Sequence, residues 1–434
     1  MNRLIFILLV AAATVSAQTV PVPATYQYTY NTLTAQIASF DSAVRANWNG
    51  SPSPVIYAPQ LETASAAKFT QLLGTSYYTN AVLPELEQLQ ALGAQGVNVH
   101  ISFPILYQPF YSSNPSQYQQ FVSFYQQLAT DVHARGMKLI VSNVVDEASY
   151  TGQTNAGAVS GSTQLLQTIL SALQGGGVTT LPIGAGTGTW LSNYLQFIQS
   201  FATTSVQFID IHIFPINNSF LMNAITAADA AHAAGKQVAI SEAWEYKENN
   251  NELGTMNLNQ LCARDPFSFW APVDTAFLSA LADFANYENL ALFSPFWSHY
   301  FSAYLDYNTY SSDPKITIDS ETASQSARLI GAFTSTGLSW MNRILPAADT
   351  TTPGVPGAST AEIYPNGATL DWSATTDNVG VAAYNLYRNG QLITTTSLLT
   401  YFDQNLTPGE TYSYTLDAFD ASGNVSGLSA PLVV

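Results

Sequence analysis

The chain alternates short apolar runs with longer segments in which apolar residues recur every three or four positions. Short apolar runs bounded by Gly or Pro are typical of buried strands, whereas the wider spacing is typical of helices. The runs that read as strands are 54–59, 97–103, 138–145, 181–185, 206–214, 237–247 and 290–297. The segments that read as helices are 28–47, 83–92, 117–135, 163–173, 190–201, 221–235 and 324–334.

This alternation predicts an α/β fold with a parallel sheet. Strand–helix units repeated over roughly 290 residues favour a closed TIM-type (β/α) barrel over an open doubly wound sheet. The run Gly184-Ala-Gly-Thr-Gly188 lacks the GxGxxG spacing of a dinucleotide site, and no acidic residue follows at the required distance. We therefore expect no nucleotide cofactor.

The pattern changes near residue 347, where a Pro/Thr/Gly linker, 349–357, separates two expected domains, 18–348 and 358–434. The second domain has short alternating runs and an Asn-Gly turn signal, which predict an antiparallel β-sandwich. Its stretches DNVGVAAYNLYRNG and TPGETYSYTLDAFDASGNVSGLS closely resemble bacterial fibronectin type III modules. The resemblance implies a spacer of the kind attached to secreted carbohydrate-active enzymes. We expect its Trp372, Tyr384 and Tyr412 to be core residues.

Composition narrows the possible partners. Of 434 residues, 12 are basic and 29 acidic, giving a net charge of −17, while only 9% are charged and 12% are aromatic. Nucleic acids and anionic membranes select for Lys and Arg, so neither is an expected partner. Abundant uncharged polar and aromatic side chains are typical of extracellular proteins that handle neutral polymers.

The N-terminus, 1–17, reads as a cleavable signal peptide. Arg3 precedes an apolar stretch, and Val15-Ser-Ala17 supplies small residues before the expected cleavage. The apolar stretch is too short for a comfortable membrane span. The single Cys262 cannot form an internal disulfide. We therefore expect a secreted protein without stable membrane insertion, stabilised by its size instead of by disulfides. We also expect it to be a monomer.

Candidate chemistry gathers where the predicted strands end, because a barrel places its working groups there. Glu147 and Glu242 follow two of these strands, and two carboxylates flanking a glycosidic bond are the minimum equipment for glycoside hydrolysis. Glu242 is preferred to Glu245 because it lies nearest the end of the buried run. The candidate sugar contacts are His212, Trp297, Trp244, His299 and Trp190.

Three of these strand ends carry a family resemblance. The segments ISEAW (240–244), SPFW (294–297) and IDIHIFP (209–215) resemble the seventh, eighth and sixth strands of clan-A retaining glycoside hydrolases. The resemblance implies Glu242 as nucleophile and Glu147 as acid/base. No HExxH pair or GxSxG elbow is present, so neither a metal cofactor nor a serine nucleophile is expected.

The family needs eight strands and the sequence offers seven candidates. Counted back from the last strand, 138–145 is the fourth and Glu147 occupies the acid/base position, with Asp and Ala flanking it in place of Asn and Pro. Counted forward, 181–185 is the fourth and a Gly replaces the acid. Either one strand escapes recognition or one βα unit is missing.

Two functions follow from this ambiguity. The first is a secreted hydrolase of a β-linked polysaccharide that works by retention. The second is a catalytically impaired barrel that acts as a non-catalytic glycan-binding or surface scaffold protein.

Overall fold

We describe the protein from a computed structural model of all 434 residues. It describes residues 21–47, 55–61, 76–102, 113, 115–144, 159–164, 166–167, 170–171, 184–295, 298–315, 317–318, 334, 336–337, 339–340, 351–357, 359–365, 367–377, 381–396, 399–404, 406–420 and 424–434. The expected signal peptide, 1–17, lies outside these residues.

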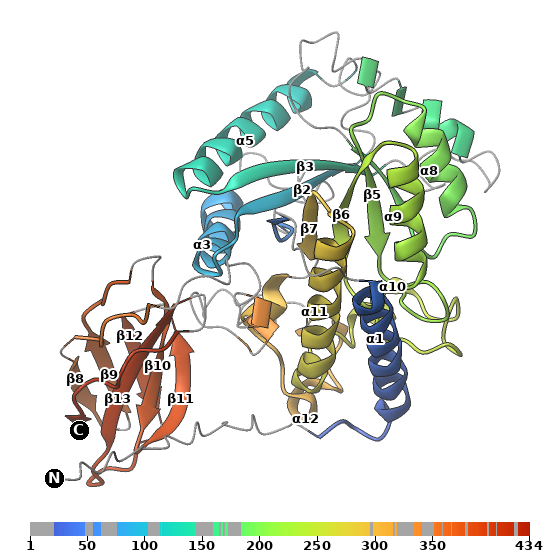
Figure 1. Ribbon diagram of the computed structural model, residues 1–434. Coiled ribbons are helices and arrows are strands. Elements are labelled where there is room, and N and C mark those ends of the chain that lie inside the picture. The colour runs from blue at the N-terminus through green and yellow to red at the C-terminus, as the bar shows by residue number, and fades with distance from the viewer. Residues whose placement is uncertain are drawn as a thin grey trace, which may run out of the picture.

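The described chain forms an α/β part followed by a β-sandwich, as Figure 1 shows. The strands of the α/β part are β1 (Ile56–Tyr57), β2 (Gly96–Ser102), β3 (Lys138–Val144), β4 (Gly184–Gly188), β5 (Phe208–Ile213), β6 (Gln237–Ala243) and β7 (Leu292–Pro295). Each overlaps a strand predicted from the sequence. The parallel α/β architecture is therefore confirmed.

Two sheets hold these strands. The larger is parallel with the order β1-β7-β6-β5-β4, and the smaller pairs β2 with β3, also in parallel. The sheets are joined after β1, where Asn98 of β2 receives a hydrogen bond from Leu61 and donates one to the Pro59 carbonyl. The strands thus follow each other in space as β4, β5, β6, β7, β1, β2 and β3.

The remaining seam lies between β3 and β4. These strands approach within 8 Å between Cα atoms, but within the described ranges no ladder pairs them. Neighbouring strands lie about 5 Å apart, so no strand separates β3 from β4 where they approach. Counted back from β7 as the eighth strand, Lys138–Val144 is the fourth, and counted forward from β1, Gly184–Gly188 is the fourth. Both counts of the sequence therefore stay open, because most of the residues between these two strands lie outside the described ranges.

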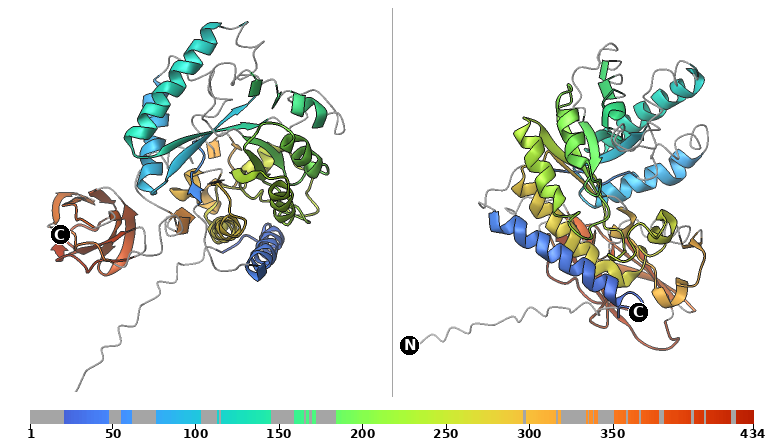
Figure 2. Two further views of the ribbon diagram at one scale, coloured as in Figure 1. Left: turned by 45° about the horizontal axis from the view of Figure 1, so that its top comes forward. Right: turned by 90° about the vertical axis from the view of Figure 1, so that its right-hand side faces the viewer.

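Helices pack on the outer side of the strands that they connect, because each has an apolar face that needs covering. Figure 2 shows α1 lying along α11, a contact between distant parts of the chain. The helices of the α/β part are α1 (Gln27–Asn47), the π-helix η2 (Tyr78–Val82), α3 (Leu83–Ala91), α5 (Pro115–Ala134), α8 (Tyr194–Ala202), α9 (Asn223–Ala233), α10 (Leu258–Cys262), the 3₁₀ helix η3 (Ser268–Trp270), α11 (Ala271–Tyr287), the 3₁₀ helix η4 (Ser298–Phe301) and α12 (Tyr307–Tyr310). The predicted helix 324–334 lies almost wholly outside the described residues.

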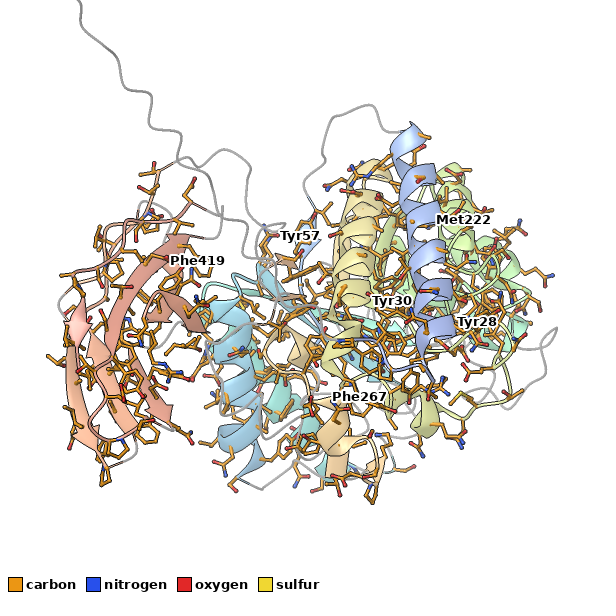
Figure 3. All side chains as sticks on the ribbon, turned by 90° about the horizontal axis from the view of Figure 1, so that it is seen from below. Tyr28, Tyr30, Tyr57, Met222, Phe267 and Phe419 are labelled. Carbon is orange, nitrogen blue, oxygen red and sulfur yellow. The ribbon has the colours of Figure 1, made fainter. Side chains whose placement is uncertain are left out.

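Aromatic rings fasten α1 to the segment before α11. Tyr30 stacks on Trp270 with ring centroids 5.8 Å apart, whereas Tyr28 is 58% exposed. Figure 3 shows both tyrosines along α1 together with Phe267. A single apolar cluster runs from α1 through the strands to Trp340. The helix that precedes β1 is therefore part of the same core as the strand ends.

The C-terminal strands form the predicted antiparallel sandwich, with sheet orders β11-β10-β13-β14 and β12-β9-β8. These strands are β8 (Ser359–Tyr364), β9 (Gly367–Trp372), β10 (Val381–Arg388), β11 (Gln391–Thr396), β12 (Thr400–Gln404), β13 (Ser413–Asp420) and β14 (Leu432–Val433). Asn389 and Gly390 both have positive φ, 53° and 77°, as the predicted hairpin turn requires. Trp372 and Tyr384 are buried in the sandwich core, and Tyr412 packs half-buried against it. The sandwich prediction is confirmed.

The linker packs on the sandwich, and one sandwich residue packs on the α/β core. Gly354 and Gly357 of the predicted linker donate backbone hydrogen bonds to Thr376 and Ser373, so described residues 351–357 lie against the sandwich. Phe419, labelled in Figure 3, is 9% exposed and clusters with the α/β core instead of the sandwich core.

Within the described residues, no helix is long and apolar enough to span a bilayer.

Candidate active site

The site is built on an irregularity in β6. Ala239 and Glu242 pair with Asp210 and His212 of β5, so three residue steps on β6 face two on β5. The ladder to β7 has the same offset between Ile240 and Ala243. Ser241 is common to both offsets and is therefore the extra residue of a β-bulge. Bulges re-aim the side chains beside them and are frequent next to active sites.

Side chains satisfy the backbone N–H and C=O groups of Ser241, because a bulge removes its residue from the hydrogen bonds of the ladder. The Ser241 N–H donates to Asp210 Oδ1 at 2.7 Å, and Asn98 Nδ2 donates to the Ser241 carbonyl at 3.0 Å. Asp210 and Asn98 are 1% and 0% exposed. Two buried polar residues on two different strands thus hold the bulge in place.

The bulge turns two consecutive side chains to one side. Asp210 and His212 are two apart on β5 and share a face. Ser241 Oγ donates to Asp210 Oδ2, and the neighbouring Glu242 faces His212, with Oε2 3.8 Å from Nδ1. In a regular strand, Ser241 and Glu242 would point to opposite faces. The bulge therefore delivers Glu242 to the face that carries His212.

Glu242 is the part of this group that reaches solvent. Its side chain is 16% exposed, whereas those of His212 and Asp210 are each 2% exposed. The other ring nitrogen of His212, Nε2, lies 3.2 Å from Asp210 Oδ2. His212 therefore lies between the buried carboxyl group of Asp210 and the partly exposed carboxyl group of Glu242.

The Gly-rich strand β4 makes room for the neighbouring side chains. A Cβ at Gly186 would lie 2.3 Å from His212 Nε2, and one at Gly184 would lie 2.0 Å from the Phe208 ring. A Cβ at Gly188 would lie 2.6 Å from the Trp190 indole. These three positions need glycine because a Cβ would clash with a neighbouring side chain. The absence of a Cβ at Gly186 leaves the space that the His212 ring occupies.

Trp244 departs from its predicted role. It is 0% exposed and packs on Phe277 and Tyr300, with ring centroids 6.4 and 5.7 Å away. A fully buried indole has no surface for a sugar, so its placement corrects the expectation of substrate contact. Trp190 is half-buried and meets Phe214 edge-on, with centroids 6.0 Å apart.

Other predicted site residues are only partly described. Glu147 and Trp297 lie outside the described residues, and of His299 only the backbone, in η4, is described. The pairing of Glu147 with Glu242 therefore stays a prediction.

The choice between Glu242 and Glu245 is decided by burial. Glu245 is 0% exposed, and its Oε1 accepts a hydrogen bond from Lys247 Nζ at 2.7 Å. Lys247, also 0% exposed, donates to Asp274 of α11 as well. Tyr304 donates to the other oxygen of Asp274 at 2.5 Å. Glu245 therefore belongs to a sealed ionic cluster and cannot meet a substrate.

This sealed cluster has strongly shifted titration. Burial raises the pKa of Glu245 well above its usual range, and the Lys247 charge only partly opposes this. Burial alone would lower the pKa of Lys247, but the carboxylates of Asp274 and Glu245 outweigh it and raise that pKa. The lysine therefore stays charged.

Glu248, on the loop after β6, is a titratable group that the sequence did not single out. It is 3% exposed, and burial, reinforced by Glu252 and opposed by Arg264, raises its pKa to about 7. Only the structure reveals it, because a loop Glu looks solvated in sequence. No group of potential metal ligands is found among the described residues.

Comparisons with known proteins cover mainly a short segment. No family model matches the chain. Chitinase Chi52 of Paenibacillus xylanexedens is 47% identical over 90 residues, which is 20% of this chain and 17% of that protein. Chitinase A1 of Niallia circulans is 43% identical over 91 residues, 21% of this chain and 13% of that protein. Exoglucanase B of Cellulomonas fimi is 40% identical over 90 residues, 20% of this chain and 8% of that protein.

The chain thus spans less than a fifth of the length of these relatives. The matched length is close to that of the C-terminal sandwich. Among solved structures, FN3tt mut is 26% identical and matches 19% of this chain and 96% of its own, with a TM-score of 0.18. Chitinase ChiA74 from Bacillus thuringiensis is 14% identical and matches 86% of this chain and 71% of its own, with a TM-score of 0.27.

Proposed function

We propose that the protein is a secreted glycoside hydrolase that cleaves a β-linked polysaccharide with retention of configuration. The observation that carries the proposal is Glu242, which a bulge at the C-terminal end of a parallel strand turns toward His212 while leaving it partly exposed. In α/β folds this end of the strands is where catalytic groups stand. Relatives named as chitinases and exoglucanases support the choice of β-linked glycans.

The proposed reaction uses two carboxyl groups. The Glu242 carboxylate forms a bond to the anomeric carbon as the glycosidic C–O bond breaks, and Glu147 gives its proton to the leaving oxygen. Water then attacks the same carbon, Glu147 takes up a proton from it, and Glu242 is released. The sugar is held by contacts that include Trp190, Trp297 and His299.

The test compares two glutamates that each face a histidine. Glu242→Gln is expected to lower hydrolysis of a panel of β-linked polysaccharides by about 10⁴-fold or more, because it removes the nucleophile. Glu288→Gln is the matched control, since Glu288 Oε2 lies 3.6 Å from His232 Nδ1 on the helical side of the domain. Its activity should be unchanged. Equal activity in the parent and the Glu242→Gln variant would overturn the proposal.

The anomeric configuration of the first product separates retention from inversion. Proton NMR of a freshly cleaved β-linked oligosaccharide should show the β-anomer before it equilibrates. An initial α-anomer would exclude Glu242 as nucleophile and leave it the role of base toward water.

The runner-up function is a non-catalytic glycan-binding or surface scaffold protein. The observation that favours it is the β3–β4 seam, because the fourth strand place carries the acid/base in the family that the sequence resembles. If the parent hydrolyses none of the panel, yet binds an insoluble polysaccharide equally well before and after Glu242→Gln, this second function replaces the first.

A further inference from the structure

Asp210 is hydrogen-bonded on two sides, and this couples two features of the proposed site. One oxygen, Oδ1, accepts the Ser241 N–H at 2.7 Å. The other, Oδ2, accepts the Ser241 hydroxyl and lies 3.2 Å from His212 Nε2. A buried carboxylate accepts hydrogen bonds and donates none. It therefore requires a proton on His212 Nε2.

We propose that Asp210 is the positioning residue of this site, because its single carboxylate fixes both the bulge that aims Glu242 and the ring orientation of His212. This inference rests on the proposed function for its catalytic consequence only. Its structural content is that His212 keeps a proton on Nε2 and turns Nδ1 toward Glu242.

The surroundings leave the ring little freedom. The main chain of β4 passes so close that a Cβ at Gly186 would lie 2.3 Å from Nε2 and 2.6 Å from Cε1 of His212. On the other side of the bulge, Asn98 Nδ2 bonds the Ser241 carbonyl and Ser294 Oγ, at 3.0 and 3.2 Å. Asn98 thus supports the bulge without contributing to the Asp210–His212 bond, which makes the two effects of Asp210 separable.

The first experiment reads the imidazole directly in the full-length protein. With ¹⁵N-labelled histidine, long-range ¹H–¹⁵N correlations distinguish a protonated ring nitrogen from a bare one. The chain has 5 histidines, and the His212 signals are identified by their loss in His212→Gln. We expect Nε2 to be protonated. A neutral His212 with its proton on Nδ1 and none on Nε2 would overturn the proposal without any variant of Asp210.

The second experiment changes Asp210 to Asn. The amide keeps an oxygen for the Ser241 N–H but turns an NH₂ toward His212 Nε2, so the proton should move to Nδ1. Hydrolysis should show kcat lower by about 10² with KM changed less than threefold, as expected for misplacement of a reacting group. Asn98→Leu should also lower kcat but leave the Nε2 proton in place.

The outcomes separate this inference from the proposed function. If no hydrolysis occurs in any form but the imidazole behaves as stated, the proposed function fails and the positioning role of Asp210 stands. If Glu242→Gln abolishes hydrolysis while Asp210→Asn leaves both kcat and the His212 proton unchanged, the positioning role fails and the proposed function stands.

Discussion

Two neighbouring groups each place a basic side chain between two carboxyl groups, and they differ in exposure to solvent. In the first, His212 lies between Asp210 of the same strand, β5, and Glu242 of β6. Lys247 lies between Glu245 and Asp274 a few residues later. The first group reaches solvent through Glu242, whereas the side chains of Lys247, Glu245 and Asp274 are all 0% exposed.

The difference shows how to distinguish a working site from a structural one. Lys247 has two carboxylates and the rings of Trp244 and Trp270, whose centroids lie 5.3 and 5.7 Å from Nζ, so every face of the ammonium is covered. Its charge is balanced by the two buried acidic residues and is not accessible to a substrate. In the Asp210 group the buried members hold an outer carboxylate that remains accessible. The buried group of Lys247, Glu245 and Asp274, here called the sealed group, should therefore govern stability. The group of Asp210, His212 and Glu242, here called the open group, should govern activity.

The largest expected effect on folding is that of Lys247→Met. It leaves Asp274 and Glu245 buried without a cation, and breaking a buried pair from one side costs about 3–5 kcal/mol. Urea unfolding should show this loss in the free energy of unfolding. His212→Gln should cost far less, because neutral Gln can still donate to Asp210. Similar losses in the two variants would remove the distinction between the groups.

A smaller effect on stability is expected at Gly186, whose backbone lies against the His212 ring. Gly186→Ala brings a methyl group against the His212 ring, and such overpacking costs about 1–3 kcal/mol. The displaced ring should also lower hydrolysis. Gly427→Ala is the control, because its Cβ would meet Val355 at an ordinary 3.5 Å. A Gly186→Ala protein with the parent's thermal midpoint and activity would show that His212 has more room than the structure gives it.

The smallest effect concerns the pH dependence of the sealed group. The pKa of Glu245 is raised in the folded state, so its contribution to stability is complete below its unfolded pKa and is lost as pH rises toward the folded value. Glu245→Gln keeps an acceptor for Lys247 and removes the titration. We expect the variant to be more stable than the parent at pH 7 and close to the parent at pH 4. Parallel stability curves between those pH values would contradict this.

The sequence predicted the strands well because they are short apolar runs with clear turns around them. The fourth was displaced by three residues, since Gly184–Gly188 carries no apolar pattern. Its glycines are there for the side chains of Phe208, His212 and Trp190. That reason depends on contacts between distant segments, which a single sequence does not show.

The helix Ala271–Tyr287 escaped prediction for a related reason. Ten of its residues are buried, including Asp274 and Asp283, so it lacks the one-sided apolar stripe that marks a surface helix. Its burial comes from α1, which covers it from the other side.

The sequence singled out Glu242 and His212 because they stand at strand ends, and the structure shows these two side chains facing each other. Asp210, Asn98 and the bulge at Ser241 were not found, because strict alternation along β6 would place Ser241 and Glu242 on opposite faces. The rule that successive side chains of a strand point to opposite faces fails where a bulge inserts one residue, and bulges are frequent next to active sites.

The most direct measurement is covalent labelling of the proposed nucleophile. The parent protein, first shown to hydrolyse an aryl β-glycoside, is incubated with the matching 2-fluoro glycoside, whose glycosyl-enzyme intermediate breaks down slowly, and its peptides are examined by mass spectrometry. The account predicts one added sugar on Glu242 and none on Glu245 or Glu288. A hydrolysing protein that carries the sugar on another residue, or that carries none, would contradict it.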